Sequence, residues 1–186
     1  MNKVTRSEVL PYPEYDKKRE TLRPQWMKIK EARRIHLGPH STFLFENHET
    51  VLYQIQEMVR VEKMQGEPEI QHEVDTYNEL LGEPGELGCT LLIEIDDEAL
   101  RAQYLSAWKG LPEALYIQTH KGQKVYAQLD ERQVGETRIS SVHYLKFKLG
   151  DQVPQKMGCD FPAYTHEVEL TPAQTAALCQ DLLGKT

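Results

Sequence analysis

The sequence lacks any long apolar run. No segment approaches the roughly 18 consecutive apolar residues that a membrane-spanning helix needs. The polar start, MNKVTRSEVL, also lacks the apolar core of a signal peptide. We therefore expect a cytoplasmic protein with no membrane segment.

Cysteine is scarce and widely spaced. The three cysteines, Cys89, Cys159 and Cys179, form no C-x-x-C pair. This excludes an all-cysteine zinc site and an iron–sulfur cluster held by this chain alone. We interpret the three residues as buried, reduced thiols, the usual state of free cysteine in the cytoplasm.

Positive charge is in deficit. The 22 lysines and arginines stand against 29 aspartates and glutamates, which gives a net charge of −7. A general nucleic-acid binder needs a cationic face that displaces counterions from phosphate, so we expect no nucleic-acid partner. Phosphate loops, dinucleotide fingerprints and G-x-S-x-G elbows are also missing from the sequence, so we expect no nucleotide cofactor.

The length and the order of the patterns predict one α+β domain. A chain of 186 residues can bury a sizeable core, and we expect a single domain over residues 1–186. Its front half, about 1–82, is predicted to be helical and its back half, about 87–186, to be sheet-rich. The predicted architecture is an antiparallel or mixed sheet in the C-terminal half with helices packed on one face.

Periodicity and capping residues predict the individual elements. Asn47 and Thr171 are expected N-caps, as is Asp96 or Asp97, and Pro24 should divide the first long helix or lie in its first turn. Residues 158–164 are expected to form an irregular loop. Helices are expected over residues 15–34, 48–64, 69–81, 97–108 and 172–183. Strands are expected over residues 41–46, 89–95, 115–118, 124–129, 141–149 and 166–170.

Residues 33–57 concentrate the groups most suited to chemistry. His36 and His40 are four residues apart, but Gly38-Pro39 between them favours a turn, so the helical two-histidine zinc spacing does not apply. On a turn the two rings could still converge with Glu46. Imidazoles and a carboxylate are a common ligand set for Fe(II) or Zn(II). The alternative is a turn histidine bonded to a backbone carbonyl.

Three residues outside the turn complete the candidate set. Glu57 lies on the next predicted helix, where the alternative role is a surface ion pair with Arg60. Glu79 ends a later helix, where a carboxylate opposes the helix dipole. His143 lies on the apolar face of a predicted strand, where a histidine can simply belong to the core. The candidate metal ligands are His36, His40, Glu46, Glu57, Glu79 and His143.

Several segments resemble an uncharacterised bacterial family, a domain of unknown function. The segments are Gly38-Pro39-His40, Phe45-Glu46-Asn47, residues 50–58, Tyr77-Asn78-Glu79-Leu80 and residues 143–147. The resemblance covers nearly the whole chain, and the block 50–58 is its most specific part. Members are often encoded beside rubrerythrin-like proteins and heterodisulfide-reductase-like iron–sulfur proteins, which implies a redox or oxidative-stress setting. At residues 159–164 the chain departs from the more usual histidine-proline pair.

Two functions follow from these patterns. The first is a cytoplasmic metal-binding protein, with iron expected and zinc as the alternative metal, in a redox setting. The second is a non-catalytic partner or adaptor for a rubrerythrin-like or iron–sulfur redox protein, docking through its sheet edges. An enzyme that binds a small organic acid through Arg33 or Arg34 is a third hypothesis, with no further support in the sequence.

Overall fold

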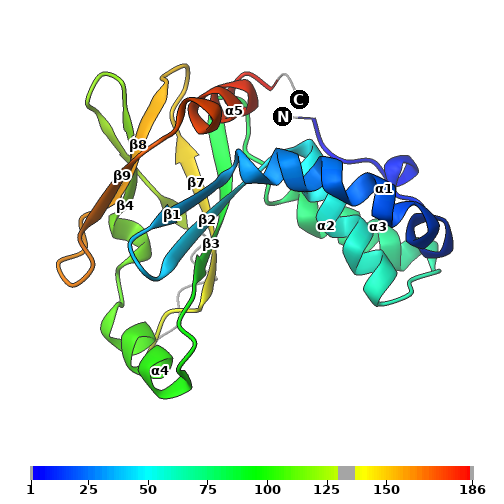
Figure 1. The fold of residues 1–186 in the computed structure, drawn as a ribbon, viewed down its shortest axis with the longest axis horizontal. Helices are drawn as coiled ribbons and strands as arrows, with labels where there is room; N and C mark the ends of the chain where they lie inside the picture. The colour runs from blue at the N-terminus through cyan, green and yellow to red at the C-terminus, as the bar shows by residue number, and fades with distance from the viewer. Residues whose placement is uncertain (1, 130–136, 185–186) are drawn as a thin grey trace.

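The computed structural model describes residues 2–129 and 137–184. Two antiparallel sheets pack face to face, and a helical lobe projects from the larger one (Figure 1). This arrangement confirms the predicted α+β class. Along the described chain, no helix combines the length and the apolar character that crossing a bilayer requires.

The larger sheet, sheet A, has the strand order β1-β2-β3-β7-β6. Its strands are β1 (Arg34–Leu37), β2 (Ser41–Glu46), β3 (Glu86–Ile93), β7 (Val142–Lys148) and β6 (Gln128–Leu129). The strand predicted over residues 89–95 corresponds to β3, a largely apolar strand that lies in the middle of the sheet. The β1–β2 hairpin comes from the front half of the chain, which therefore supplies strands as well as helices.

The smaller sheet, sheet B, has the order β5-β4-β8-β9. Its strands are β5 (Lys124–Tyr126), β4 (Leu115–Thr119), β8 (Pro154–Cys159) and β9 (His166–Glu169). The strands predicted over residues 115–118 and 124–129 include β4 and β5, which pair as an antiparallel hairpin, but β8 was not predicted. Proline is tolerated at the first residue of a strand, where Pro154 lies. Gly158 lets a ring cross the strand, because a Cβ there would be 2.3 Å from Cζ of Tyr116.

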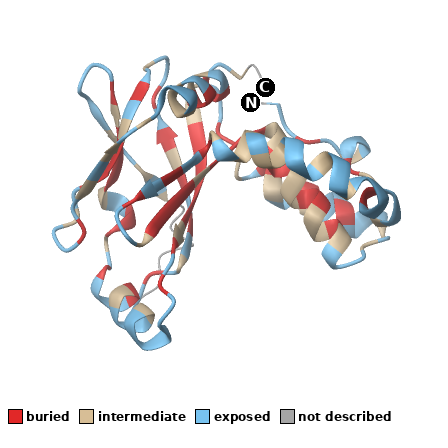
Figure 2. Cartoon of the chain, viewed as in Figure 1, coloured by how far each residue is buried: buried red, intermediate tan, exposed pale blue. Residues whose placement is uncertain are grey.

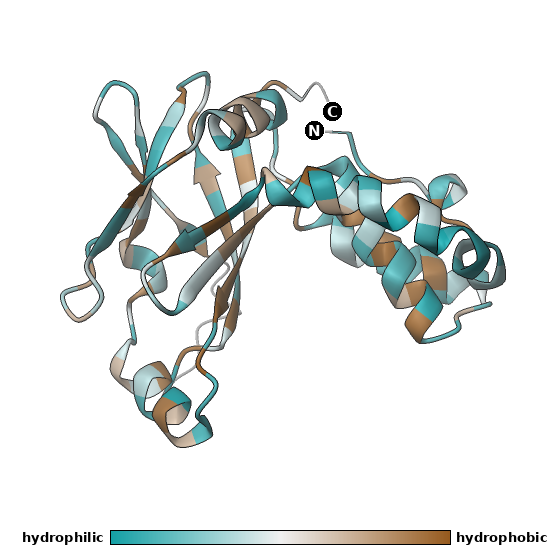
Figure 3. Ribbon diagram, viewed as in Figure 1, coloured by the Kyte–Doolittle hydropathy of each residue, from teal (hydrophilic) through white to brown (hydrophobic). Residues whose placement is uncertain are grey.

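The main core fills the space between the two sheets. Phe43, Phe45 and Leu91 face it from sheet A, and Ile117 and Met157 face it from sheet B. Figure 2 shows the buried segments concentrated where the sheets meet, and Figure 3 shows hydrophobic residues along β2 and β3. Alternation of buried and exposed residues, clearest in β7, gives each sheet an inner face, and the two inner faces pack as a sandwich.

Helices close the two ends of the sandwich. α4 (Glu98–Ala107) lies at one end and α5 (Pro172–Leu182) at the other (Figure 1). Asp97 caps α4 by accepting a hydrogen bond from Leu100 N at 2.7 Å, and Thr171 caps α5 through a capping box. Both caps confirm the prediction. Short 3-10 turns lie at η1 (Arg6–Glu8) and η2 (Pro112–Ala114).

The helical lobe has a core of its own. Its helices are α1 (Tyr12–Glu31), α2 (His48–Val61) and α3 (Glu67–Asn78). Its buried residues are Val4, Val9, Val51, Ile55, Val59, Ile70, Val74 and Leu81. The prediction that Pro24 divides or opens a helix was wrong, because α1 runs through it. Pro24 is exposed, so water can satisfy the carbonyl that loses its amide partner.

Candidate functional site

His36 lies exposed on the outer face of sheet A, the face that is turned away from sheet B. Its Nδ1 is 2.9 Å from the hydroxyl of Thr42, which in turn donates to the carboxylate of Glu94. Since that hydroxyl has one proton, Nδ1 of His36 is the donor in its own bond with Thr42. This tautomer leaves Nε2 of the neutral ring as the acceptor.

His40 points elsewhere. Its Nδ1 is 3.3 Å from the backbone oxygen of Glu94, and its ring packs against Tyr104, Trp108 and Tyr164 at centroid distances of 5.7, 5.9 and 6.4 Å. The bend itself is tight, because a Cβ on Gly38 would be 2.6 Å from the ring of His166. The structure therefore places His40 in an aromatic cluster with a backbone hydrogen bond, the alternative role considered for a turn histidine.

Glu46 is 1% exposed at the end of β2. Its carboxylate accepts hydrogen bonds from Thr50 at 2.6 Å, Gln54 at 2.8 Å and Thr90 at 3.2 Å. Three neutral donors thus compensate a carboxylate that burial would otherwise penalise. Two of the donors belong to the block 50–58, which gives that block a structural role.

Glu57 and Glu79 lie apart from the bend. Glu57 accepts from Tyr15 at 2.5 Å and from Arg19 at 2.8 Å. Burial raises the pKa of Glu57, but these two hydrogen bonds outweigh it and leave the pKa below its ordinary value. Arg60, the partner considered from the sequence, is at 3.5 Å. Glu79 is exposed at the C-cap of α3.

His143 is 1% exposed and faces the core, as the alternation of β7 predicted. Its Nε2 is 2.9 Å from the backbone oxygen of Ser140, while its buried Nδ1 has no hydrogen-bond partner in the described chain. Burial lowers the pKa of His143 below its ordinary value.

This burial predicts an acid-sensitive contribution to stability. The unfolded chain binds the proton with a pKa of about 6.5 and the folded chain only at lower pH, so stability falls as the pH drops below about 6.5. His143→Phe should remove that part of the pH dependence, and His72→Phe, at an exposed position on α3, should retain it. Urea unfolding of the wild-type protein and the two variants at several pH values measures how the free energy of unfolding depends on pH. Parallel curves for all three would contradict the assignment.

The six candidate residues therefore occupy separate environments. Across residues 2–129 and 137–184, no group of three or more His, Cys, Asp and Glu side chains is placed to hold a metal ion. Arg33 is 5% exposed and forms a bidentate pair with Asp181, both bonds being 2.8 Å, so its guanidinium is already engaged.

Lys30, near the end of α1, is half-buried, with Nζ 5.3 Å from the ring centroid of Tyr53. Burial lowers the pKa of Lys30. The last turn of α1 lies against α2, which covers a helix face that would otherwise be solvated.

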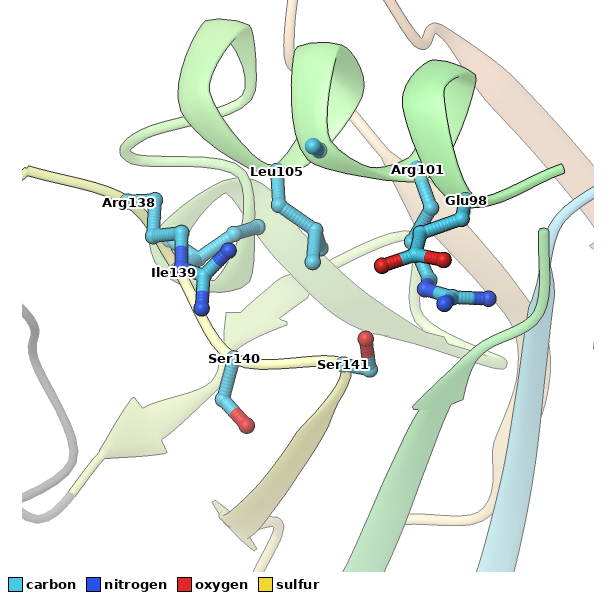
Figure 4. A pocket seen from close by; sticks show the side chains of 8 residues that line it. Glu98, Arg101, Leu105, Arg138, Ile139, Ser140 and Ser141 are labelled. Carbon is cyan, nitrogen blue, oxygen red and sulfur yellow. The ribbon is translucent and has the colours of Figure 1, made fainter.

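A pocket of about 400 Å³ lies between α4 and the segment 138–141 that leads into β7 (Figure 4). Backbone hydrogen bonds fix its walls. Ile139 N donates to Leu105 O at 3.0 Å, and Ile93 N donates to Ser141 O at 2.8 Å. The pocket is lined by Glu98, Arg101, Ala102, Leu105, Arg138, Ile139, Ser140 and Ser141.

The pocket combines an apolar wall with charged groups of both signs. Leu105 and Ile139 are 5% and 4% exposed. Glu98 and Arg138 both line the space, yet within the described part of the chain neither side chain has a hydrogen bond or ion pair. Figure 4 shows the Glu98 carboxylate and the Ser141 hydroxyl directed into the space below α4. These groups are therefore available to a ligand.

The sequence matches the family model described as a protein of unknown function, DUF3501, over residues 3–182. The chain belongs to the DUF3501 family. Its fold is similar to a crystal structure of a novel protein of unknown function from Burkholderia pseudomallei K96243, with a TM-score of 0.89 and 30% identity over 97% of this chain and 100% of that chain. No curated protein matched the sequence.

The pocket of this DUF3501 protein was missed in the sequence. Its two sides, Glu98–Arg101 and Arg138–Ser141, lie about forty positions apart, and only the tertiary fold brings them together. The available signals were local. Glu98 and Arg101 are three apart on a helix with a recognisable cap, and two serines follow Arg138 directly before a recognisable strand.

Proposed function

We propose that this DUF3501 protein binds a small metabolite that carries a carboxylate or phosphate group, in the pocket between α4 and residues 138–141. The observation that carries the proposal is that Arg138 lines the cavity and has no hydrogen-bond or ion-pair partner among residues 2–129 and 137–184. The volume, about 400 Å³, falls within the range of small-molecule sites, which are typically about 300–1,000 Å³.

The chemistry of the lining residues supports an anionic ligand group. Arginine stays charged at all relevant pH values and offers a planar set of N–H donors that matches carboxylate and phosphate oxygens. Ser141 adds a hydroxyl that is directed into the same space. The apolar wall formed by Leu105 and Ile139 excludes water from one side of the space, which strengthens such charge-assisted hydrogen bonds.

Arg138→Gln is expected to weaken binding of inorganic phosphate and of isovalerate at least roughly tenfold, because it removes a charged donor. Amide NMR titrations of both anions measure the dissociation constants and should shift the amides of Leu105, Ile139 and Ser141. Arg23→Gln is the matched control, at an exposed arginine on α1. Equal weakening by the two variants, or no shifts at these amides, would refute the proposal.

Iron or zinc binding in a redox setting stays a second proposal, and one contact favours it. Thr42 and Glu94 orient the His36 ring so that Nε2 is the acceptor, as carboxylate-supported metal ligands are oriented. The further ligands would come from water or from a partner such as a rubrerythrin-like or iron–sulfur protein, which is the adaptor role expected from the resemblance.

His36→Ala is expected to lower the metal content after anaerobic purification with Fe(II), while His72→Ala should not, because His72 is exposed on α3 away from this contact. Elemental analysis of the wild-type protein and the two variants measures the metal content. Equal, sub-stoichiometric metal in all of them would dispose of this second proposal.

A further inference from the structure

We propose that the ligand of this pocket is a zwitterion, an α-amino acid with a short apolar side chain. The inference rests on the proposed function and specifies its ligand. It assigns the ligand's carboxylate to Arg138, its ammonium group to Glu98, and its side chain to the wall formed by Leu105 and Ile139.

Two opposite charges share one cavity without pairing with each other. Glu98 comes from the first turn of α4 and Arg138 from the segment that precedes β7. A simple anion at Arg138 would leave the Glu98 carboxylate unpaired and would be repelled by it. A ligand with one group of each sign satisfies both side chains.

Two other polar residues of the pocket, Arg101 and Ser140, are already engaged by the protein. Arg101 donates from Nη1 to Ile95 O at 2.9 Å, which holds its guanidinium at the edge. Ser140 Oγ accepts from Val142 N at 3.1 Å, and Figure 4 shows its hydroxyl turned away from the space. Arg138, Ser141 and Glu98 are then the groups directed at a ligand, which matches one carboxylate and one ammonium group.

The apolar wall of the pocket favours a ligand with an aliphatic side chain. Leu105 and Ile139 are almost fully buried, yet both line the pocket, so the exposed part of each is turned to the ligand. The backbone bond from Ile139 to Leu105 holds them side by side. A short aliphatic side chain covers this wall, whereas a strongly polar one would lose water there without gaining a hydrogen bond.

L-Valine and its two single-charge fragments test the assignment. Isovalerate lacks the ammonium group and isobutylamine lacks the carboxylate. Wild-type protein should bind valine at least tenfold more tightly than either fragment in amide NMR titrations. Glu98→Gln should abolish the preference for valine over isovalerate and leave isovalerate binding equal or stronger. Arg138→Gln should abolish the preference for valine over isobutylamine.

The outcomes separate the two proposals. If isovalerate and phosphate bind as tightly as valine, and Glu98→Gln does not weaken valine, the zwitterion inference fails while anion binding stands. If none of the probes binds, both fail. If Glu98→Gln weakens the binding of every probe to the same extent, the inference is also overturned. Glu31→Gln, exposed on α1, is the matched control, and thermal unfolding checks that each variant is folded.

Discussion

Replacing Asp181 by asparagine is expected to lower the free energy of unfolding by about 3–5 kcal/mol. The carboxylate of Asp181, 2% exposed, accepts two hydrogen bonds of 2.8 Å from Arg33, 5% exposed. The variant leaves a buried guanidinium without its counter-charge, and the cost is mainly that of the uncompensated charge. Urea unfolding measures the change.

A double-mutant cycle isolates this pair. Arg33→Met and Asp181→Leu should each be strongly destabilising, whereas the double variant should cost much less than their sum, because an apolar pair no longer contains a buried charge. Glu14→Gln is the control at the exposed Glu14–Lys18 pair and should cost less than about 0.5 kcal/mol. Additive effects of the two buried substitutions would show that the pair does not act as a unit.

Local sequence signals predicted local structure well. Asn47 accepts a hydrogen bond from Thr50 N, and the strand Ser41–Glu46 begins and ends where its composition indicated. The inward direction of His143 followed from simple alternation. These features depend on a few neighbouring residues, so the sequence carries enough information for them.

The structure does not bring the candidate metal ligands together, for a geometric reason. His36 pairs with Thr42 across the β1–β2 hairpin, and Glu46 lies four residues further along β2. At about 3.3 Å per residue, this is a separation of about 13 Å along the strand, too far for a common ligand sphere. His40 leaves the sheet for an aromatic cluster built by residues over sixty positions away. Neither the spacing of His36 and Glu46 in the sheet nor the aromatic surroundings of His40 can be predicted from the sequence of the turn alone.

The prediction for Pro24 was wrong, and the burial of Lys30 and the α4 pocket were not predicted, because all three depend on contacts between distant segments. The packing of α1 against α2 overrides the tendency of Pro24 to break a helix and covers Lys30. The pocket needs the α4 end of the sandwich to meet the segment before β7. Capping and periodicity describe each of these segments separately and say nothing about their contact.

The second large effect is expected at Gly88, where the helical lobe meets sheet A. A Cβ on this residue would lie 1.8 Å from the backbone oxygen of Leu80 and 3.1 Å from Gly82 N. The chain leaving α3 therefore crosses directly over β3, where only glycine fits. Lys146 secures the same crossing by donating to Leu81 O.

Gly88→Ala is expected to cost about 3 kcal/mol, because backbone atoms must move apart and the lobe is displaced from the sheet. For a chain of this length, that corresponds to a fall in melting temperature of roughly 6–12 °C. The two tryptophans allow each part to be followed, since Trp26 is in the lobe and Trp108 in the sandwich core.

The variants Trp26→Phe and Trp108→Phe each keep one tryptophan, so fluorescence during thermal unfolding follows the sandwich in the first and the lobe in the second. The difference between the two melting temperatures should become larger when Gly88→Ala is added to both variants. Gly66→Ala is the control, because its Cβ would meet only the flexible Glu69 side chain, at 3.2 Å. That variant loses at most a glycine N-cap and should cost no more than about 1 kcal/mol. Equal melting temperatures for the two glycine variants would show that the crossing at Gly88 is not a close contact.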